Sequence, residues 1–244
     1  MTDSAFTQEQ FEAIYPRGIE NHYWNHARNR ILRTFLVKHG LTNERILEIG
    51  CGKGIVVEFL RKQNIDCYGV ELSNVKPIPE AKEYILTNTN AFSLQQYFTK
   101  GIKTIMLLDV IEHIEDPVSF IDSILNSFPN ASHIVVTVPA RQELWTNYDV
   151  FNGHFRRYVL NDITDMRNQR LEVKDSGYFN HVLYPVFLLF AKIVKNRSTV
   201  IHAPSGISVF LHRMLSRILQ LDTMLVPKKI PGTSIMALFS IRSK

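Results

Sequence analysis

The sequence predicts a doubly wound α/β fold, in which helices cover both faces of a mostly parallel sheet. A short apolar run rich in β-formers, residues 45–49, ends in three glycines spaced two apart, and an apolar-periodic helix starts directly after them. Further short apolar runs alternate with helix-like stretches up to residue 138. At 244 residues, one large domain with a modest insertion is favoured over two independent domains.

Residues 1–40 are expected to form an N-terminal helical cap. One helix is predicted around residues 7–14 and a longer one from residue 18 or 19 to residue 39, where Gly40 ends it. The apolar side chains of the longer helix recur at helical spacing: Tyr23, Trp24, Ala27, Ile31, Leu32, Phe35 and Leu36.

Residues 41–181 are expected to form the core, and a last strand within residues 231–244 completes its sheet. The helix after the glycine turn is predicted to start at Ile55. The later elements are expected, in chain order, as strands 67–70, 84–87 and 104–109, helix 118–128, strand 133–138, a helix opened by residues 153–158, and strands 171–174 and 233–241.

Residues 182–230 are expected to form a helical insertion or lid. Within residues 207–219, one apolar stripe lies opposite a polar and basic face, which predicts an amphipathic helix. We favour a lid packed on the main domain over a membrane-surface contact through residues 182–219. The stripe consists of Ile207, Phe210, Leu211, Met214, Leu215, Ile218 and Leu219.

The glycine turn predicts a nucleotide-like ligand. Gly50, Gly52 and Gly54 lack the Cβ that would keep a ligand away from the backbone. Seventeen residues after the last glycine, Glu71 ends a second apolar run, where an acid can bind ribose hydroxyls. The turn reads E-x-G-x-G-x-G rather than G-x-G-x-x-G, and its acid, Glu48, would repel a diphosphate and attract a cationic or zwitterionic ligand.

This pattern resembles the first motif of class I S-adenosylmethionine-dependent methyltransferases. Asn90 and Ala91 stand where the family usually has Asp-Ala, and the amide oxygen of Asn90 can still accept a bond from the adenine amino group. Residues 109–117, D-V-I-E-H-I-E-D-P, are similar to the family's fourth-strand motif. The resemblance implies a Rossmann-like seven-stranded sheet with an antiparallel last strand, S-adenosylmethionine as cofactor and S-adenosylhomocysteine as product. A plain doubly wound domain and a dehydrogenase are the alternatives.

The resemblance also implies a donor site. Glu71 would hold the ribose diol, while Glu48 and Asp109 would balance the cationic aminoacyl end, Glu48 directly or through an ordered water. The glycine turn shapes that end with Gly50, Cys51, Gly52 and Gly54. Leu72, Asn90, Ala91 and Phe92 would form the adenine slot, and Val110 and Ile111 the sulfonium wall.

An N-terminal pattern adds three candidates to the donor site. Tyr23, Trp24 and Arg28 match a pattern found in a subset of the family, in which the aromatic covers the cofactor and the arginine reaches its carboxylate. Residues four apart share one helix face, so Trp24 and Arg28 can act together. The alternative for Trp24 is a core anchor.

Two histidines are candidates for a general base. His113 follows the fourth strand, and its ordinary pKa near neutrality suits proton transfer, although a helix-start histidine that holds the loop is the alternative. His154 is the second candidate. Glu112 is expected to face away from the site. No metal is predicted, because residues 112–116 lack the spacing of helix-borne ligands.

The loop after the fifth strand is expected to bind the acceptor, because loops at the carboxyl ends of parallel strands surround the ligand crevice. Its candidate residues are Trp145, Arg156, Arg157 and Tyr158, the last three within a G-H-x-R-R-Y pattern seen in a subset of the family. An arginine pair in a turn is otherwise a solvated face. The Asp/Asn-Pro-Pro-aromatic turn of DNA adenine methylases is absent, which leaves O-methylation or a less demanding N- or C-acceptor.

The composition of the chain limits the kinds of binding partner that are expected. The net charge of +5 is scattered, without a basic tail or an RNA-binding motif, so no nucleic acid is expected. The N-terminus lacks a signal pattern, and the longest apolar run is shorter than the roughly 20 residues that span a bilayer, so a cytoplasmic location is expected.

We favour O-methylation of a small-molecule or glycan-pathway acceptor. The alternatives are a membrane-surface methyltransferase for a lipid-linked acceptor and a non-catalytic cofactor-binding module. Oligomeric state stays open.

Overall fold

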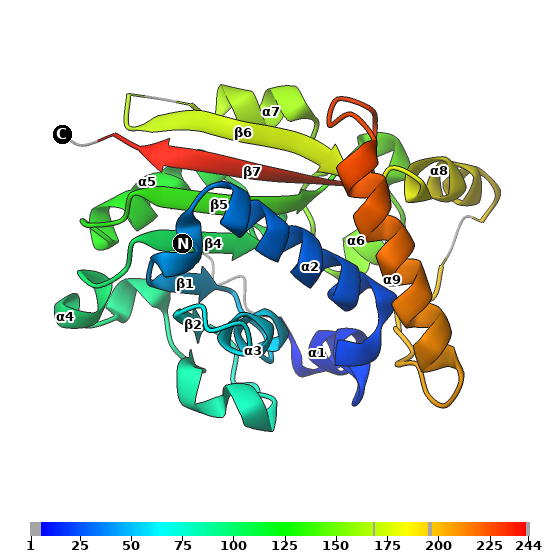
Figure 1. Cartoon of the computed structure of the whole chain (residues 1–244), viewed down its shortest axis with the longest axis horizontal. Coiled ribbons are helices and arrows are strands. Elements are labelled where there is room, and N and C mark those ends of the chain that lie inside the picture. Colours follow the sequence, from blue (N-terminus) through cyan, green and yellow to red (C-terminus); the bar gives the residue numbers. More distant parts are fainter. Residues whose placement is uncertain (1–5, 168, 195–196, 243–244) are drawn as a thin grey trace.

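The computed structural model describes residues 6–167, 169–194 and 197–242. A seven-stranded sheet in the order β3-β2-β1-β4-β5-β7-β6 crosses the molecule (Figure 1). Strands β1 to β5 are parallel, and β7 pairs antiparallel with both β5 and β6, as predicted. The strands are β1 (Ile46–Ile49), β2 (Cys67–Val70), β3 (Ile85–Leu86), β4 (Thr104–Leu108), β5 (His133–Pro139), β6 (Leu171–Phe179) and β7 (Ser234–Ile241). The outermost residues of the predicted cap and last-strand segment, 1–5 and 243–244, and residues 195–196 of the predicted insertion, lie outside this description.

The strand order determines where a ligand can bind. Every residue of β1 and β4 is buried, as expected for central parallel strands that are covered on both faces. The chain adds β2 and β3 on one side of β1 and then returns to add β4 on the other side. This reversal makes a crevice at the carboxyl ends of β1 and β4, the usual ligand position in such sheets.

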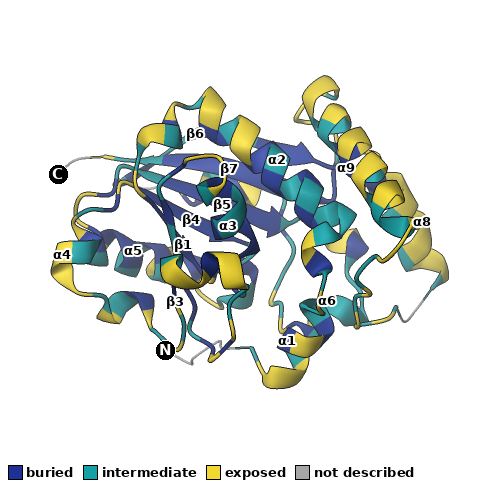
Figure 2. Ribbon diagram, turned by 60° about the horizontal axis from the view of Figure 1, so that its bottom comes forward, coloured by how far each residue is buried: buried dark blue, intermediate teal, exposed yellow. Residues whose placement is uncertain are grey.

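Helices cover both faces of the sheet, and the buried side chains form one cluster on each face. Helices α2 (Tyr23–Lys38) and α3 (Ile55–Arg61) pack on one face, and α5 (Pro117–Ser127) and α7 (Leu160–Asp165) pack on the other. The strands between them are buried along most of their length (Figure 2). The fold class predicted from the sequence is therefore confirmed.

The N-terminal helices differ slightly from the prediction. Helix α1 (Gln8–Ile14) starts after Thr7, whose side chain and that of Gln10 form a reciprocal capping box. The predicted long helix is divided into a short 3₁₀ turn (Ile19–Asn21) and α2. His22 has an extended backbone and its ring nitrogen caps the N–H of Trp24, so the α-helix begins only after it.

Three later elements also depart from the prediction. Residues 153–158 open no helix. Helix α6 (Asn147–Phe151) ends before them and α7 begins after them. Strand β6 has nine residues rather than four, because it continues beyond a register shift between Val173 and Asp175 along its partner β7. The short helix α4 (Gln96–Thr99) was not predicted.

The insertion folds into α8 (Leu183–Ile193) and α9 (Ser208–Leu225). Helix α9 lies along α2 (Figure 1), and Arg30 Nη1 donates to Ser216 Oγ at 2.8 Å between them. Only Ser216 and Leu219 of α9 are buried. Most of the predicted apolar stripe consequently faces solvent. Among the described residues, no helix combines the length and apolarity needed to cross a membrane.

Candidate functional site

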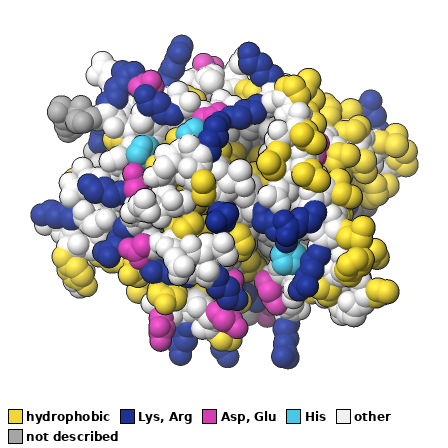
Figure 3. Space-filling view, in the orientation of Figure 1, with side chains coloured by type: hydrophobic (Ala, Val, Ile, Leu, Met, Phe, Trp, Pro, Cys, Tyr) yellow, Lys and Arg dark blue, Asp and Glu magenta, His cyan; other side chains and the backbone are white. Residues whose placement is uncertain are grey.

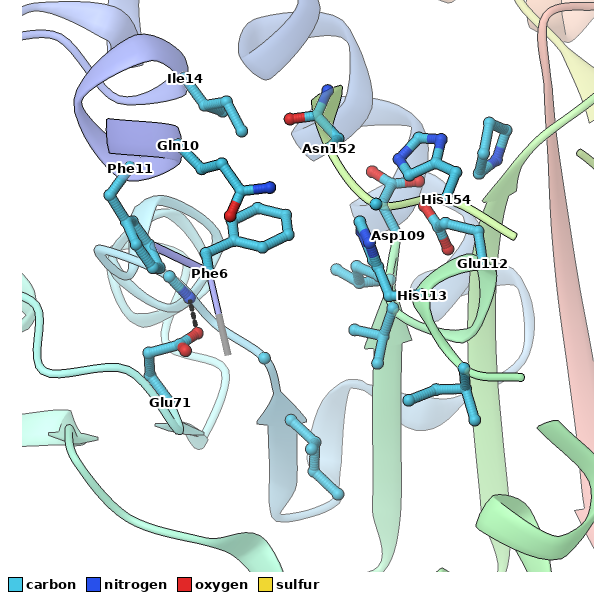
Figure 4. A pocket seen from close by; sticks show the side chains of 18 of the residues that line it. Phe6, Gln10, Phe11, Ile14, Glu71, Asp109, Glu112, His113, Asn152 and His154 are labelled. Atoms are coloured by element: carbon cyan, nitrogen blue, oxygen red, sulfur yellow. Dashed lines mark hydrogen bonds between the residues drawn. The ribbon is translucent and has the colours of Figure 1, made fainter. Parts of the chain in front are cut away.

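A cavity of about 850 Å³ lies at the carboxyl ends of β1, β2 and β4, within the size range of small-molecule sites. Helix α1, the glycine turn and the loops after β2, β4 and β5 contribute its walls. Figure 4 shows two groups of side chains facing each other across it. We call them the Glu71 half, with Glu71, Gly52 and Phe11, and the His154 half, with Glu112, His113 and His154.

In the Glu71 half, the backbone holds the carboxylate in place. Glu71 Oε2 accepts the N–H of Gly52 and Oε1 accepts the N–H of Ser73, each at 2.9 Å. Each oxygen keeps a lone pair for a further hydrogen bond. Gly52 has φ +54°, and a Cβ there would lie 2.7 Å from the hydroxyl of Tyr15. A glycine is therefore required for this close approach.

Arg28 and Asp109 lie between the two halves. Arg28 Nη1 donates to Asp109 Oδ2 at 2.9 Å, and Asp109 Oδ1 accepts the hydroxyl of Thr137 at 3.1 Å. Both residues line the cavity, and the buried Nε of Arg28 has no hydrogen-bond partner among the described residues. A free buried donor is costly unless a ligand satisfies it.

Glu48 does not line the cavity. It is buried beneath the glycine turn, where burial, opposed in part by Arg28, raises the pKa of its carboxyl to about 8. Glu48 is therefore set back from the cavity wall, and the prediction that it balances the aminoacyl end stays a prediction. Its Oε2 has no partner among the described residues, which leaves the predicted contact through a water.

The predicted adenine slot lies together in the structure, since Leu72, Asn90, Ala91 and Phe92 all line the cavity. Asn90 Oδ1 also accepts the N–H of Phe92 at 2.9 Å, so the amide has a capping role as well. Tyr23, Trp24 and Val110 complete this wall. Trp24 lines the cavity, and its ring also stacks on Phe179 with centroids 6.3 Å apart, which is the packing contact considered for it.

Glu112, His113 and His154 form the other half. The imidazoles of His113 and His154 meet edge to face with centroids 4.7 Å apart. Glu112 is only 1% exposed, and its Oε2 has no partner among the described residues. The expectation that Glu112 faces away is wrong, because the 3₁₀ turn Ile111–His113 brings both of its last residues to the cavity. Burial and nearby Asp109 raise the pKa of Glu112 well above its usual range.

His154 is oriented by a buried ion pair. Its Nδ1 lies 3.0 Å from Oδ1 of Asp149, which is fully buried and also binds Arg157 through Nε at 2.8 Å and Nη2 at 3.1 Å. Burial alone would raise the pKa of Asp149, but the hydrogen bond from His154 and the charge of Arg157 lower it to about 2. Asp149 is therefore an anion that holds the His154 ring.

Of the four residues predicted for the acceptor, only Arg157 lines the cavity. The guanidinium of Arg157 is occupied by Asp149 and by the carbonyl of Ala140. Arg156 lies at the surface and donates to the Glu115 carbonyl, while the buried Tyr158 hydroxyl donates to the Ile111 carbonyl. Trp145 does not line the cavity, and its ring centroid is 6.5 Å from that of His154.

Three residues predicted for the donor site also lie outside the cavity wall. Ile111 is fully buried in the core, and Cys51 is buried against Gly69. Gly54 starts α3, and a Cβ on it would lie 1.9 Å from a methyl group of Ile85. These residues shape the turn through packing rather than through contact with a ligand.

Sequence reasoning missed the contribution of the first helix. Phe6, Gln10, Phe11, Ile14 and Tyr15 line the cavity, and the Phe6 ring packs edge to face on His113 with centroids 5.0 Å apart. The aromatic pair at positions 11 and 15 was the available signal, since residues four apart share a helix face. From the insertion and α6, Phe187, Arg197 and Tyr148 also line the cavity.

A family model described as "Methyltransferase domain" matches residues 20–170, more than half of the chain. The chain belongs to this methyltransferase family. The identification of a class I S-adenosylmethionine-dependent methyltransferase from the sequence is thereby confirmed, and the observed sheet has the expected topology.

Relatives of this methyltransferase include the ubiquinone biosynthesis O-methyltransferases of Aliivibrio fischeri (strain MJ11) and Nitrosomonas europaea. The first is 26% identical over 106 residues, which cover 39% of this chain and 44% of the relative. The second is 26% identical over 92 residues, which cover 34% and 39%. The matched region therefore spans less than half the length of these relatives.

Two solved structures share the fold of this methyltransferase. The plantazolicin methyltransferase BpumL in complex with SAH superposes with a TM-score of 0.55 at 16% identity, covering 96% of this chain and 94% of its own. The methyltransferase domain of bacterial CtHen1 superposes with a TM-score of 0.55 at 12% identity, covering 88% and 97%.

Proposed function

We propose that the protein transfers the methyl group of S-adenosylmethionine to a hydroxyl oxygen of a small-molecule acceptor. The observation that carries the proposal is the arrangement of the cavity, with a backbone-held acid, Glu71, on one side and two adjacent histidines on the other. The relatives named above are O-methyltransferases, which favours oxygen as the acceptor atom.

The Glu71 half fits the donor. The two fixed oxygens of Glu71 can each accept a hydrogen bond from a ribose hydroxyl. Asn90 lies in the same wall for the adenine, and the free Nε of Arg28 can donate to the aminoacyl carboxylate. The sulfonium methyl group would then point past Val110 toward the histidines.

The His154 half fits a hydroxyl acceptor. Methyl transfer is an in-line displacement, so the protein must align the acceptor oxygen and remove its proton. Burial and the neighbouring His154 lower the pKa of His113 to about 4, so the ring is neutral at pH 7 and can accept a hydrogen bond from the acceptor. Asp149 fixes the orientation of the second ring.

Replacement of His113 tests this assignment. His113→Ala should reduce turnover roughly 10²–10⁴-fold, the scale for removing a group that handles the transferred proton. The dissociation constant for S-adenosylmethionine, measured by calorimetry, should change little. Acceptors are first found by screening hydroxyl, amine and thiol compounds for the mass gain of one methyl group.

His202→Ala, at an exposed position, is the matched control and should behave as the wild type. Full turnover in His113→Ala would contradict the proposal. Loss of donor binding in that variant would place His113 in the donor site instead.

A second candidate function is methylation of a lipid-linked acceptor at an anionic membrane surface, and the exposed face of α8 and α9 favours it. Large apolar side chains gather on this side of the molecule (Figure 3). The same two helices carry three exposed basic residues, Lys192, Arg213 and Arg217. Phe187 of α8 lines the cavity while Leu189 and Ile193 are 61% and 70% exposed, so one helix connects this face to the site. Exposed apolar and basic side chains on the same helices suit anionic lipid.

Sedimentation with anionic vesicles tests this second candidate. The wild type should pellet with phosphatidylglycerol vesicles and stay in solution with phosphatidylcholine alone. A double variant, Phe210→Glu and Ile218→Glu, should lose binding, because both side chains are more than half exposed on α9. Val118→Glu, at an exposed apolar position on α5, is the control. A wild type that stays in the supernatant with both vesicles excludes the membrane function.

A further inference from the structure

We propose that Glu112, His113 and His154 bind a divalent transition-metal ion at the acceptor end of the cavity. The role given to the ion rests on the proposed O-methylation, while its binding does not. The sequence favoured no metal, because the spacing within residues 112–116 is not that of helix-borne ligands. The structure brings the third group from a separate segment.

The three side chains are placed for coordination. Each offers one ligand atom, and these atoms all lie within 4.8 Å of one another. Figure 4 shows them on one wall of the cavity, two from the 3₁₀ turn after β4 and one from the loop after α6. Two imidazoles and one carboxylate form a common metal-binding set, and the open cavity leaves positions for further ligands.

The carboxylate of Glu112 lacks the compensation that other buried acids of this site receive. Glu71 accepts two backbone N–H groups, and Asp149 binds both Arg157 and His154. Glu112 is 1% exposed, and its Oε2 has no partner within the described part of the chain. Burial of this oxygen without a partner is costly, and a bound cation would give it one.

His154 has the support typical of a metal ligand. A metal-binding histidine usually gives its other ring nitrogen to a carboxylate or carbonyl, which fixes the ring. Here His154 Nδ1 lies 3.0 Å from Asp149 Oδ1, and Arg157 holds Asp149 in place in turn. The Nε2 of His154 is then the atom available to a metal.

The ion would assist transfer by binding the acceptor oxygen. With the ion bound, His113 would serve as its ligand rather than as the proton acceptor: metal binding lowers the pKa of the acceptor hydroxyl, whose proton leaves to water. The oxygen then forms a bond to the methyl carbon, the carbon–sulfur bond breaks, and its electron pair stays on sulfur to give the thioether product. The two nitrogen ligands favour a divalent ion of the first transition row, such as Mn²⁺ or Zn²⁺, over Mg²⁺ or Ca²⁺.

Calorimetry on the full chain after chelator treatment tests the site without donor or acceptor. Titration with Mn²⁺ and with Zn²⁺ should show one ion bound per chain, and Mg²⁺ should bind more weakly. Glu112→Gln and His154→Ala should each weaken Mn²⁺ binding more than about 100-fold, and Asp149→Asn about 10–100-fold through the orientation of His154. Glu115→Gln, an acid elsewhere on the cavity wall, and the exposed His202→Ala should bind as the wild type.

Glu112→Gln separates a metal ligand from a structural acid. The substitution keeps the shape and removes a buried acid whose Oε2 has no partner within the described residues, so the metal-free variant should unfold at the same or a higher temperature than the wild type, while Mn²⁺ should no longer raise that temperature. The proposal is overturned if the wild type binds neither Mn²⁺ nor Zn²⁺. It is also overturned if Glu112→Gln and His154→Ala bind Mn²⁺ as tightly as the wild type does. S-adenosylmethionine titrated into the same samples keeps the two questions apart. Donor binding without metal binding refutes the ion alone, and metal binding without donor binding refutes the proposed function.

Discussion

The Glu71 half and the His154 half of the cavity are held by different means. Glu71 is fixed by the N–H groups of Gly52 and Ser73, which belong to the turns that follow β1 and β2. His154 is fixed by Asp149, which depends on Arg157, so three side chains act in series. The first half is a property of local backbone, whereas the second depends on side chains that meet only in the folded protein. Single substitutions should therefore have different consequences in the two halves.

Replacement of Arg157 should destabilise the His154 half of the cavity, with the largest effect expected of the substitutions compared. Arg157→Ala leaves the fully buried Asp149 without its main partner, which should cost about 3–5 kcal/mol of unfolding free energy. Urea denaturation followed by circular dichroism measures this loss. Arg156→Ala is the matched control, because its exposed guanidinium binds only a backbone carbonyl among the described residues, and its stability should stay near that of the wild type. Equal stabilities for the two variants would show that Asp149 does not need Arg157.

Replacement of Glu71 should have a smaller effect. Glu71→Ala should weaken S-adenosylmethionine binding by about 1.5–3 kcal/mol, the scale for hydrogen bonds to a charged group. It should also lower the unfolding free energy, because the buried N–H groups of Gly52 and Ser73 lose their acceptor. Asn90→Ala removes a neutral partner and should cost about 0.5–1.5 kcal/mol. Calorimetry on both variants gives the comparison. Wild-type affinity in Glu71→Ala would remove the end of β2 from the donor site.

The same division explains what could be predicted from the sequence. The parallel strands, the glycine turn and Glu71 follow from short runs of residues, because apolar periodicity and glycine spacing act locally. The length of β6 could not be predicted, since it depends on pairing with β7. Predictions succeeded where backbone geometry alone determines the structure.

The second half of the cavity required contacts that no local pattern records. Glu112 was expected to face away because a strand alternates its side chains, but a 3₁₀ turn follows β4 and changes that direction. Arg157 was expected to bind an acceptor, and a partner eight residues earlier occupies it. Of the apolar stripe predicted on α9, only Leu219 is buried, and α9 meets α2 at Ser216, whose hydroxyl accepts a hydrogen bond from Arg30.

The short length of helix α1 bears on how the donor enters and leaves the cavity. It has seven residues, fewer than the roughly 12–15 that make an isolated helix stable in water, so its order depends on what it touches. Gln10 Nε2 donates to the Phe151 carbonyl at 2.7 Å, and the Ala13 carbonyl accepts the N–H of Ile201 at 2.9 Å. These few bonds hold a wall of the cavity. We expect exchange of spent donor for fresh donor to involve movement of this helix, because its side chains form one wall of the cavity.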